Sequence, residues 1–277
     1  GKDGSFSLYP SQPWTNEAAS EDVSAVFLDV NTDGFKDLIV LSGGSGDFEN
    51  QPHLLLDRFY ANNGKGAFFR IGNVLPESNT ASYDIIVENI DDDPQLEIMI
   101  IGAAKAGKYP QKENTIIYDY VKNTYVDITD KIVPDLNKTS GLIRSASWSD
   151  VNGDGKKDLI TVGEWQNPQL FLYENGTYVN KSEEWNLTDH NGWWRSVSSG
   201  DFDKDGDIDF IIGNVGKNFK QKASKDYPLY LYSNDFDNNG TLDCVLAKPY
   251  KGKVVPARGK ECSTQQMPFV SEKFETY

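Results

Sequence analysis

The chain contains five copies of an acidic nine-residue loop, each between two apolar runs, and this repetition constrains the fold more than any other feature. Positions one, three, five and nine of the loop are Asp, Asn or Glu in every copy. Hard cations such as Ca²⁺ take about six to eight oxygen ligands from carboxylates, amide oxygens and backbone carbonyls. Four oxygen side chains on one tight loop, with the carbonyl of position seven, would supply most of such a shell. Loops one to five are Asp29–Asp37, Asn89–Glu97, Asp150–Asp158, Asp201–Asp209 and Asp235–Asp243.

The end of the loop and its flanks separate it from the EF-hand, whose loop opens in a similar way. An EF-hand loop closes with a bidentate acid at position twelve and lies between two helices. Position twelve of the five copies is instead Val40, Ile100, Thr161, Ile212 and Leu246. The runs that follow the loops, such as Leu38–Leu41, are rich in apolar and β-branched residues, as strands are. The sequence therefore predicts a strand–loop–strand unit and excludes the EF-hand.

The spacing of the loops indicates a propeller. Loop starts are separated by 60, 61, 51 and 34 residues, and a period of roughly 40 to 60 residues with several short strands is typical of propeller blades. We expect an all-β chain whose residues 1–277 form a single β-propeller domain, with about four to five blades visible. Each blade would be a four-stranded antiparallel sheet with its acidic loop between the first and second strands. The short last interval predicts an incomplete blade, and we expect the chain to be part of a longer protein.

Each loop divides its residues between a metal ion and the interior. Position two is always apolar, which predicts packing between blades for Val30, Ile90, Val151, Phe202 and Phe236. Positions one, three, five and nine would bind Ca²⁺ through side chains, and position seven through its carbonyl. The predicted ligands are Asp29, Asn31, Asp33, Phe35 and Asp37 in loop one; Asn89, Asp91, Asp93, Gln95 and Glu97 in loop two; Asp150, Asn152, Asp154, Lys156 and Asp158 in loop three; Asp201, Asp203, Asp205, Asp207 and Asp209 in loop four; and Asp235, Asp237, Asn239, Thr241 and Asp243 in loop five.

The bound calcium is expected to be structural, in up to five sites. A metal ion screens carboxylates that repel one another, and its binding adds to folding stability. Loop two is the exception, because Pro94 stands where the other loops have glycine. Proline fixes φ near −65° and cannot form a left-handed turn, so the Asn89–Glu97 site is in question.

The loop pattern Asp-x-Asp-x-Asp-Gly-x-x-Asp between strands resembles the FG-GAP and VCBS repeats of β-propellers, with calcium loops like those of integrin α-subunits. Longer stretches resemble the bacterial branch associated with ASPIC/UnbV-type domains: Asn191–Trp194, Gly213–Asn218, Tyr232–Gly240 and Glu261–Pro268. The resemblance covers roughly residues 24–277. It implies a bacterial, secreted or cell-surface propeller that holds calcium, and it implies no defined activity.

The net charge of −15 belongs largely to the loops. Sixteen carboxylates occupy the ligand positions, and five Ca²⁺ ions would add ten positive charges and leave −5. The remaining negative field disfavours nucleic acid as a partner. The sequence has no run of about 18 apolar residues that would predict a membrane span. Loops of modest affinity would fill at about millimolar extracellular calcium, so we expect an exported protein: extracellular, periplasmic or on the outer surface.

Two cysteines are present, Cys244 and Cys262. Cys244 stands at position ten of loop five, where the other copies have Leu, Ile or Phe. A buried thiol and a disulfide to Cys262 both fit this position, since nothing in the spacing demands a bridge.

Two arginines and a group of tryptophans are the candidate ligand-binding residues. Arg144 and Arg195 each precede a loop by six residues, so at about 3.3 Å per residue they lie about 20 Å from the metals, at the opposite end of neighbouring blades. Arginine forks suit the carboxylates of acidic sugars or peptides, but ion pairs between blades would also account for these residues. Trp165, Trp193 and Trp194 would either stack on sugar rings or pack between blades.

Two classes of function remain open. The first is a calcium-binding, non-catalytic module that binds a glycan or a protein through a propeller face. The alternative is a calcium-dependent carbohydrate-active enzyme, a lyase or glycoside hydrolase on a propeller scaffold. No catalytic residue is assigned, because no nucleophile-elbow motif is present and a catalytic pair cannot be singled out among 42 acids. The non-catalytic module is therefore favoured.

Overall fold

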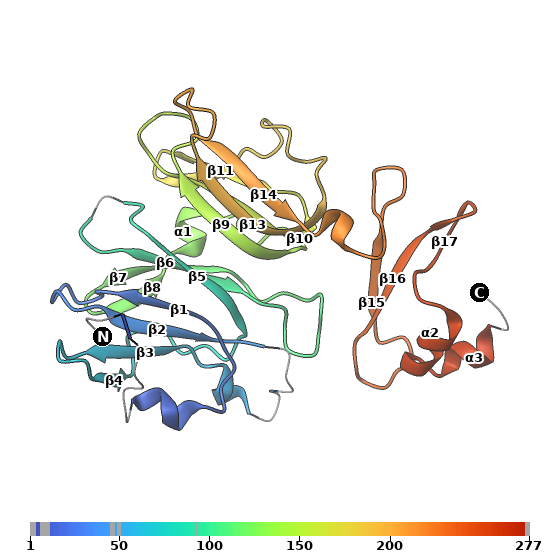
Figure 1. Cartoon of the computed structure of the whole chain (residues 1–277), viewed down its shortest axis with the longest axis horizontal. Helices are drawn as coiled ribbons and strands as arrows, with labels where there is room; N and C mark the ends of the chain where they lie inside the picture. The colour runs from blue at the N-terminus through green and yellow to red at the C-terminus, as the bar shows by residue number, and fades with distance from the viewer. Residues whose placement is uncertain (1–3, 6–11, 45–47, 49–50, 92, 275–277) are drawn as a thin grey trace.

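The computed structural model describes residues 4–5, 12–44, 48, 51–91 and 93–274, and over these the chain is an all-β protein with few helices (Figure 1). The first sheet contains β1 (Asp22–Leu28), β2 (Asp37–Ser42), β3 (Arg58–Asn62) and β4 (Phe68–Ile71). The second contains β5 (Ser82–Glu88), β6 (Glu97–Gly102), β7 (Ile116–Val121) and β8 (Thr124–Asp127). Both are four-stranded and antiparallel, with their strands in sequence order, as the sequence predicts.

The third sheet is larger because two strands of the next unit join it. Its strands are β9 (Leu142–Ser149), β10 (Asp158–Gln166), β11 (Gln169–Glu174), β12 (Thr177–Asn180), β13 (Gly192–Gly200) and β14 (Asp209–Asn214). β10 has nine residues, whereas β2 and β6 have six. The end of this longer strand pairs with β13, where Glu164 lies opposite Trp193.

The last sheet has three strands, β15 (Tyr230–Asn234), β16 (Asp243–Tyr250) and β17 (Lys253–Pro256), and the chain continues into α2 (Lys260–Gln266) and α3 (Phe269–Lys273). This sheet lies to one side of the others, so the described residues do not form a closed ring (Figure 1). The 34-residue interval between loops four and five is short because only β14 and β15 stand between them, whereas four strands, β2 to β5, stand between loops one and two. The closed propeller therefore stays a prediction.

The remaining helices are short. They are η1 (Pro13–Glu17), η2 (Pro52–Leu55), α1 (Thr129–Ile132) and η3 (Gly216–Asn218). Within the described part of the chain, no helix has the length and apolar character needed to cross a membrane.

All five acidic loops connect antiparallel strands, and the acid at position nine is always the first residue of the second strand. The residue at position two packs between sheets in the first three loops. Val30 belongs to a core cluster that spans the first and second sheets. Ile90 packs against the next cluster, and Val151 against a third that includes residues of β13 and β14.

Loop four departs from the prediction that position two is interior. The Phe202 side chain is 51% exposed. The prediction is wrong here because the β15–β17 sheet lies apart from β14 instead of covering it (Figure 1). Phe236 of loop five is half-buried.

Candidate functional site

Four of the acidic loops share a tight turn around the glycine at position six. This glycine has φ between +83° and +100° in Gly34, Gly155, Gly206 and Gly240, a left-handed conformation that costs glycine no steric strain. Its N–H donates to the carboxylate of position one at 2.9–3.2 Å. The N–H groups of positions five and seven donate to the side chains of positions three and five. These bonds gather the oxygen side chains on the inside of one turn.

The acid at position nine distinguishes the loops from ordinary exposed turns. Asp37 and Asp158 are fully buried, and Glu97 and Asp243 nearly so. In all five loops this carboxylate accepts a hydrogen bond from the N–H of position two, at 2.7–3.2 Å. Burial raises the pKa of Asp37 and Asp158 above the ordinary value. Because a buried carboxylate is costly unless a cation or a metal compensates it, the geometry fits a bound cation.

Loop two gathers its acids without the glycine turn. Pro94 has no N–H to donate, and the Asn89 side-chain amide donates instead to the Asp93 carbonyl at 2.5 Å. Ligand oxygens of Asp91, Asp93 and Glu97 lie within 4.8 Å of one another. Glu97 Oε1 is buried with no hydrogen-bond partner among the described residues, and burial together with nearby acids raises the pKa of Glu97 to about 7. Loop two, whose site was in question because of Pro94, therefore also brings together oxygen atoms that could bind a cation.

A further acid, Asp119 on β7, lies close enough to loop two to interact with it, and the sequence analysis missed it. Burial raises the pKa of Asp119, and the charges of Asp91 and Asp93 raise it further. Its Oδ1 is buried and has no hydrogen-bond partner among the described residues. The strand register places Asp119 where the first sheet has Ala61 and the third has Leu172. The available signal was one acid in an otherwise uncharged strand.

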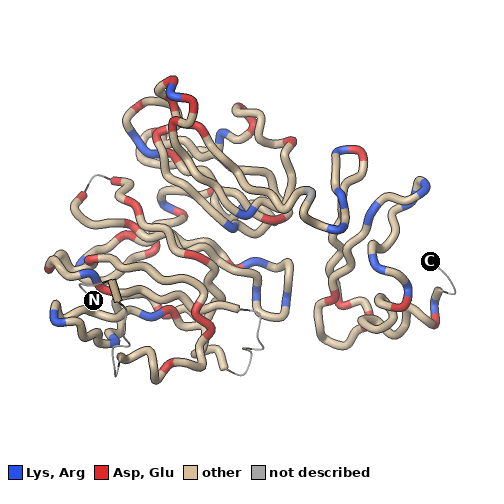
Figure 2. The backbone as a smooth tube through the Cα atoms, in the orientation of Figure 1, with Lys and Arg blue, Asp and Glu red and all other residues tan. Residues whose placement is uncertain are grey.

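Loops four and five also hold convergent acids. In each, three carboxylates have ligand oxygens within 4.8 Å of one another: Asp201, Asp203 and Asp209, and Asp235, Asp237 and Asp243. A hydrogen bond with Asp205 raises the pKa of Asp207, and the charge of Asp205 adds to the effect. Loop four appears as a mostly red turn at the tip of β13 and β14 (Figure 2). Two oxygens that both bind Ca²⁺ at about 2.4 Å can be at most about 4.8 Å apart, so these spacings suit one shared ion.

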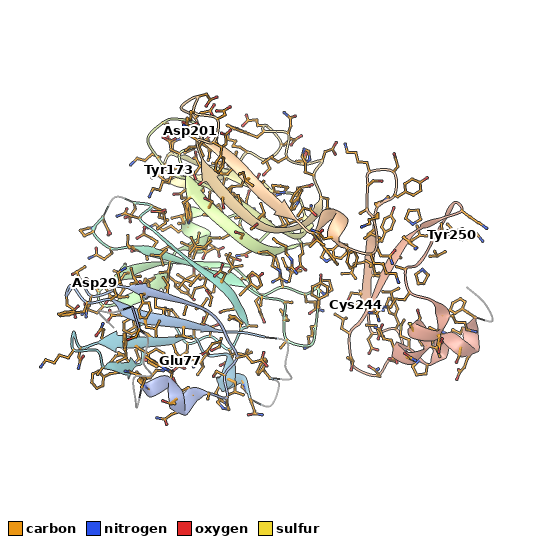
Figure 3. The ribbon with its side chains drawn as sticks, in the orientation of Figure 1. Asp29, Glu77, Tyr173, Asp201, Cys244 and Tyr250 are labelled. Atoms are coloured by element: carbon orange, nitrogen blue, oxygen red, sulfur yellow. The ribbon has the colours of Figure 1, made fainter. Side chains whose placement is uncertain are left out.

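A cavity of about 1110 Å³ lies at the end of the sheets opposite these loops. β9 and β10 define the two ends: Ser149 pairs with Asp158 beside loop three, and Leu142 pairs with Glu164 beside the cavity. In Figure 3, Asp29 and Asp201 lie on one side of the molecule and the cavity residue Cys244 lies on the other. The volume is slightly above the usual range for small-molecule sites, about 300–1,000 Å³.

Glu164 is the centre of the cavity's polar network. Its Oε1 accepts from Arg144 Nε at 2.9 Å and from Arg195 Nη1. Its Oε2 accepts from the Tyr109 hydroxyl at 2.8 Å, and that hydroxyl accepts from Trp165 Nε1 at 2.6 Å. The structure thus brings the two predicted arginines together on one protein carboxylate. Whether they also bind a ligand stays a prediction.

Aromatic rings line the cavity beside this network. Trp165 and Trp193 meet edge to face with ring centroids 5.1 Å apart, and Phe219 lies 5.1 Å from Trp193. Trp165 has φ of +59°, within a register shift between β10 and β13. Strained backbone of this kind is enriched at functional sites. Trp194, the neighbour of Trp193, is not part of the cavity: it packs against the Val197 cluster, and its Nε1 donates to the His190 carbonyl at 2.9 Å.

The C-terminal sheet forms the opposite wall of the cavity. Cys244 Sγ and Ser233 Oγ donate to the Tyr109 carbonyl, at 2.9 and 3.4 Å. Cys244 and Cys262 both line the cavity as free thiols. Lys220 and Arg258 add two cations to the lining. The sequence analysis missed these two cations, as well as Tyr109 and Glu164, because no local motif links segments so far apart in the chain.

Comparisons with known proteins support the repeat and add little about chemistry. Residues 150–212 match the family described as FG-GAP-like repeat, which confirms the predicted repeat there. The association with ASPIC/UnbV-type domains stays a prediction. No curated protein matches the chain.

Two solved structures are similar in part. One is an Agrocybe aegerita lectin that recognises non-reducing terminal N-acetylglucosamine (15% identity, TM-score 0.40, 85% of this chain and 65% of that one). The other is the V. cholerae biofilm matrix protein Bap1 (15% identity, TM-score 0.39, 87% of this chain and 36% of that one). The chain therefore spans less than two thirds of the length of either structure.

Proposed function

We propose that this chain, whose residues 150–212 match the FG-GAP-like repeat, is a calcium-binding, non-catalytic propeller module that binds a glycan or a protein in the cavity opposite its acidic loops. The proposal treats residues 1–277 as one domain of an exported bacterial protein, extracellular, periplasmic or on the outer surface.

The observation that carries the calcium assignment is the recurrence of an acid at position nine at the start of the second strand, buried in four of the five loops. Ordinary Asp-rich turns are solvated and do not bury a carboxylate at the same position in four loops of one chain. A divalent ion would compensate these charges and bind the acids of positions one, three and five. Loops one, three, four and five would hold it through the glycine turn, and loop two through its three convergent acids.

The cavity supports binding more than catalysis. Among its described lining residues, Glu164 is the single carboxylate, whereas glycoside hydrolysis ordinarily needs two. Both oxygens of Glu164 already accept hydrogen bonds. Burial raises the pKa of the Tyr109 hydroxyl, and its hydrogen bond with Glu164 raises it further, so Tyr109 is a poor base for a lyase. Glu164, Tyr109 and the two arginines therefore bond to one another, which favours a structural role for them over a catalytic one.

Calcium-dependent stability and ligand binding test the proposal together. The metal-stripped protein should melt at a lower temperature than the same protein with Ca²⁺. An equal concentration of Mg²⁺ should raise the melting temperature of the stripped protein by less than Ca²⁺ does, because Mg²⁺ demands near-octahedral geometry. A glycan array screened with the calcium-loaded and stripped protein should give binding in the loaded form. Equal melting temperatures in Ca²⁺ and in chelator would overturn the calcium assignment. Cleavage of a bound glycan over time would favour the enzyme alternative.

A further inference from the structure

The cavity has the opposite charge to the molecule that contains it. The chain carries a formal charge of −15. Among the described residues that line the cavity, the charged ones are Arg144, Arg195, Lys220, Arg258 and Glu164. Four cations against one anion give the lining a net charge of +3. A cationic hollow in an acidic molecule concentrates anions and repels cations.

The arginine pair leaves one positive charge uncompensated. Arg144 is buried (8% exposed), stacks over the Tyr83 ring at 4.4 Å and bonds to Glu164 through Nε. Arg195 shares the same Glu164 oxygen through Nη1, and half of its side chain is exposed. One carboxylate neutralises one of the two guanidiniums. A guanidinium has five N–H donors, and Arg195 uses one of them within the described structure. Its remaining donors suit the two oxygens of an incoming carboxylate.

The other two cations approach from different segments. Arg258 follows β17, and Lys220 follows η3. Both side chains are exposed, and neither forms an ion pair with another described residue. A ligand that satisfies Arg195, Lys220 and Arg258 must therefore carry several anionic groups spaced along its length.

The aromatic lining selects among such ligands. Trp165, Trp193 and Phe219 form a continuous row with centroid separations of 5.1 Å. Aromatic rings offer a flat apolar surface that fits the apolar face of a pyranose, and here they line the same cavity as Arg195. A sugar that carries a carboxylate on its ring presents both surfaces at once. An acidic peptide would use the cations and leave the aromatic row without a matching partner.

We propose that the cavity binds an acidic oligosaccharide built of uronate sugars. One carboxylate forms the second anionic partner of Arg195, its ring lies against Trp193 and Phe219, and neighbouring carboxylates reach Lys220 and Arg258. This inference rests on the proposed function, because it names the ligand class of the same cavity.

The test is calorimetric titration of the calcium-loaded protein, freed of excess Ca²⁺, with oligosaccharides of glucuronic acid. The comparison ligands are the methyl ester of the same sugar, which keeps the ring and removes the charge, and a short poly-glutamate peptide. Arg195→Gln and Arg258→Gln should each weaken binding of the glucuronate ligand by about 10- to 100-fold, the effect expected for loss of one charge-assisted hydrogen bond. Arg195→Lys should bind the sugar more tightly than Arg195→Gln and more weakly than the parent, because lysine keeps the positive charge but lacks the paired N–H donors of a guanidinium.

Arg70→Gln is the matched control, since Arg70 of β4 pairs with Glu17 of η1 and does not line the cavity. It should bind the sugar as the parent does. Arg258 has no described partner, so its variant tests the cavity without disturbing the fold. Parental affinity in both cavity variants, tighter binding of the peptide or of the ester than of the sugar, or no binding of the sugar would each overturn the uronate assignment. The broader proposal would survive these results if another glycan or a protein bound, and it fails separately if calcium has no effect on melting.

Discussion

At the loop end of the sheets, buried carboxylates such as Asp37 and Asp158 belong to a nine-residue pattern that recurs along the chain. At the cavity end, Glu164 is equally buried but takes its partners from the segment before β7, from β9 and from β13. At both ends a carboxylate is removed from water, and the group that could balance its charge differs between them. Under the proposed function the loop end would take a cation from solution, whereas the cavity end uses two arginines of the chain itself.

This difference predicts how each end responds when its counter-charge is removed. The loop end should lose stability when calcium is removed, and the cavity end should not. The predictions below test this contrast, from the largest expected effect to the smallest.

Chelation should produce the largest loss of stability. Each site with calcium at about 100 times its Kd contributes about 2.7 kcal/mol to the free energy of unfolding, and several sites act together. Scanning calorimetry in Ca²⁺ and in chelator should show a fall in melting temperature that depends on the free Ca²⁺ concentration. A melting temperature that ignores calcium would mean that the loop acids are balanced in some other way.

Glu164→Ala should be the most damaging single substitution at the cavity end. It leaves the buried Arg144 guanidinium without a counter-charge, and breaking a buried pair in this way costs about 3–5 kcal/mol. The control is Glu174→Ala, which removes a partly exposed pair with Lys181 and should cost about 0–1 kcal/mol. Urea unfolding measures both. The difference between melting in calcium and in chelator should be the same in Glu164→Ala as in the parent; a smaller difference would mean that the two ends are coupled.

The local repeat explains why the metal loops were predictable and the cavity was not. Positions one, three, five and nine recur within nine residues, so the sequence alone identified the acidic loops and the strands on either side. That these residues bind Ca²⁺ stays a prediction. The cavity depends on three extra residues at the end of β10, which bring Glu164 and Trp165 to β13. Arg144 and Arg195 were identified by their repeat-equivalent positions, but the carboxylate between them was not, because register at a bulge is a tertiary property. Asp119 was missed for the same reason: its neighbours are on another strand.

Asp57 is a half-buried carboxylate outside the acidic loops that forms no ion pair with the described residues, and it should respond to pH. It accepts hydrogen bonds from the Ser42 N–H at 2.9 Å and the Ser82 hydroxyl at 2.8 Å. Burial raises its pKa from 3.8 to about 6. The folded state therefore binds the proton more tightly than the unfolded state, and this group's contribution to stability is complete below about pH 4 and is lost as pH rises through about 6. The loss is about 3 kcal/mol at most.

Asp57→Asn cannot ionise, so its stability relative to the parent should rise between about pH 4 and pH 7. Urea unfolding in chelator at several pH values isolates the effect from metal binding. The control is Asp135→Asn, at an acid paired with Lys138 on the surface. Its free energy of unfolding should differ from that of the parent by the same amount at every pH in this range. A constant difference between Asp57→Asn and the parent across this range would show that Asp57 titrates in the folded state as it does in water.

The smallest expected effect separates two loops. Asp205→Ala should weaken the calcium dependence of melting more than Asp93→Ala, because loop four has the glycine turn and the Gly206 N–H bond to Asp201, whereas Pro94 denies loop two that turn. Both substitutions remove one negative charge, so the repulsion relieved in chelator should be similar. A tenfold loss of affinity at one site corresponds to about 1.4 kcal/mol, and we expect a difference of about 1 kcal/mol between the variants.

Equal calcium dependence would mean that the three acids of loop two, with Asp119 near them, compensate for Pro94. In that case, adding Asp119→Asn to Asp93→Ala should remove the compensation, and an unchanged double variant would exclude Asp119 from the site.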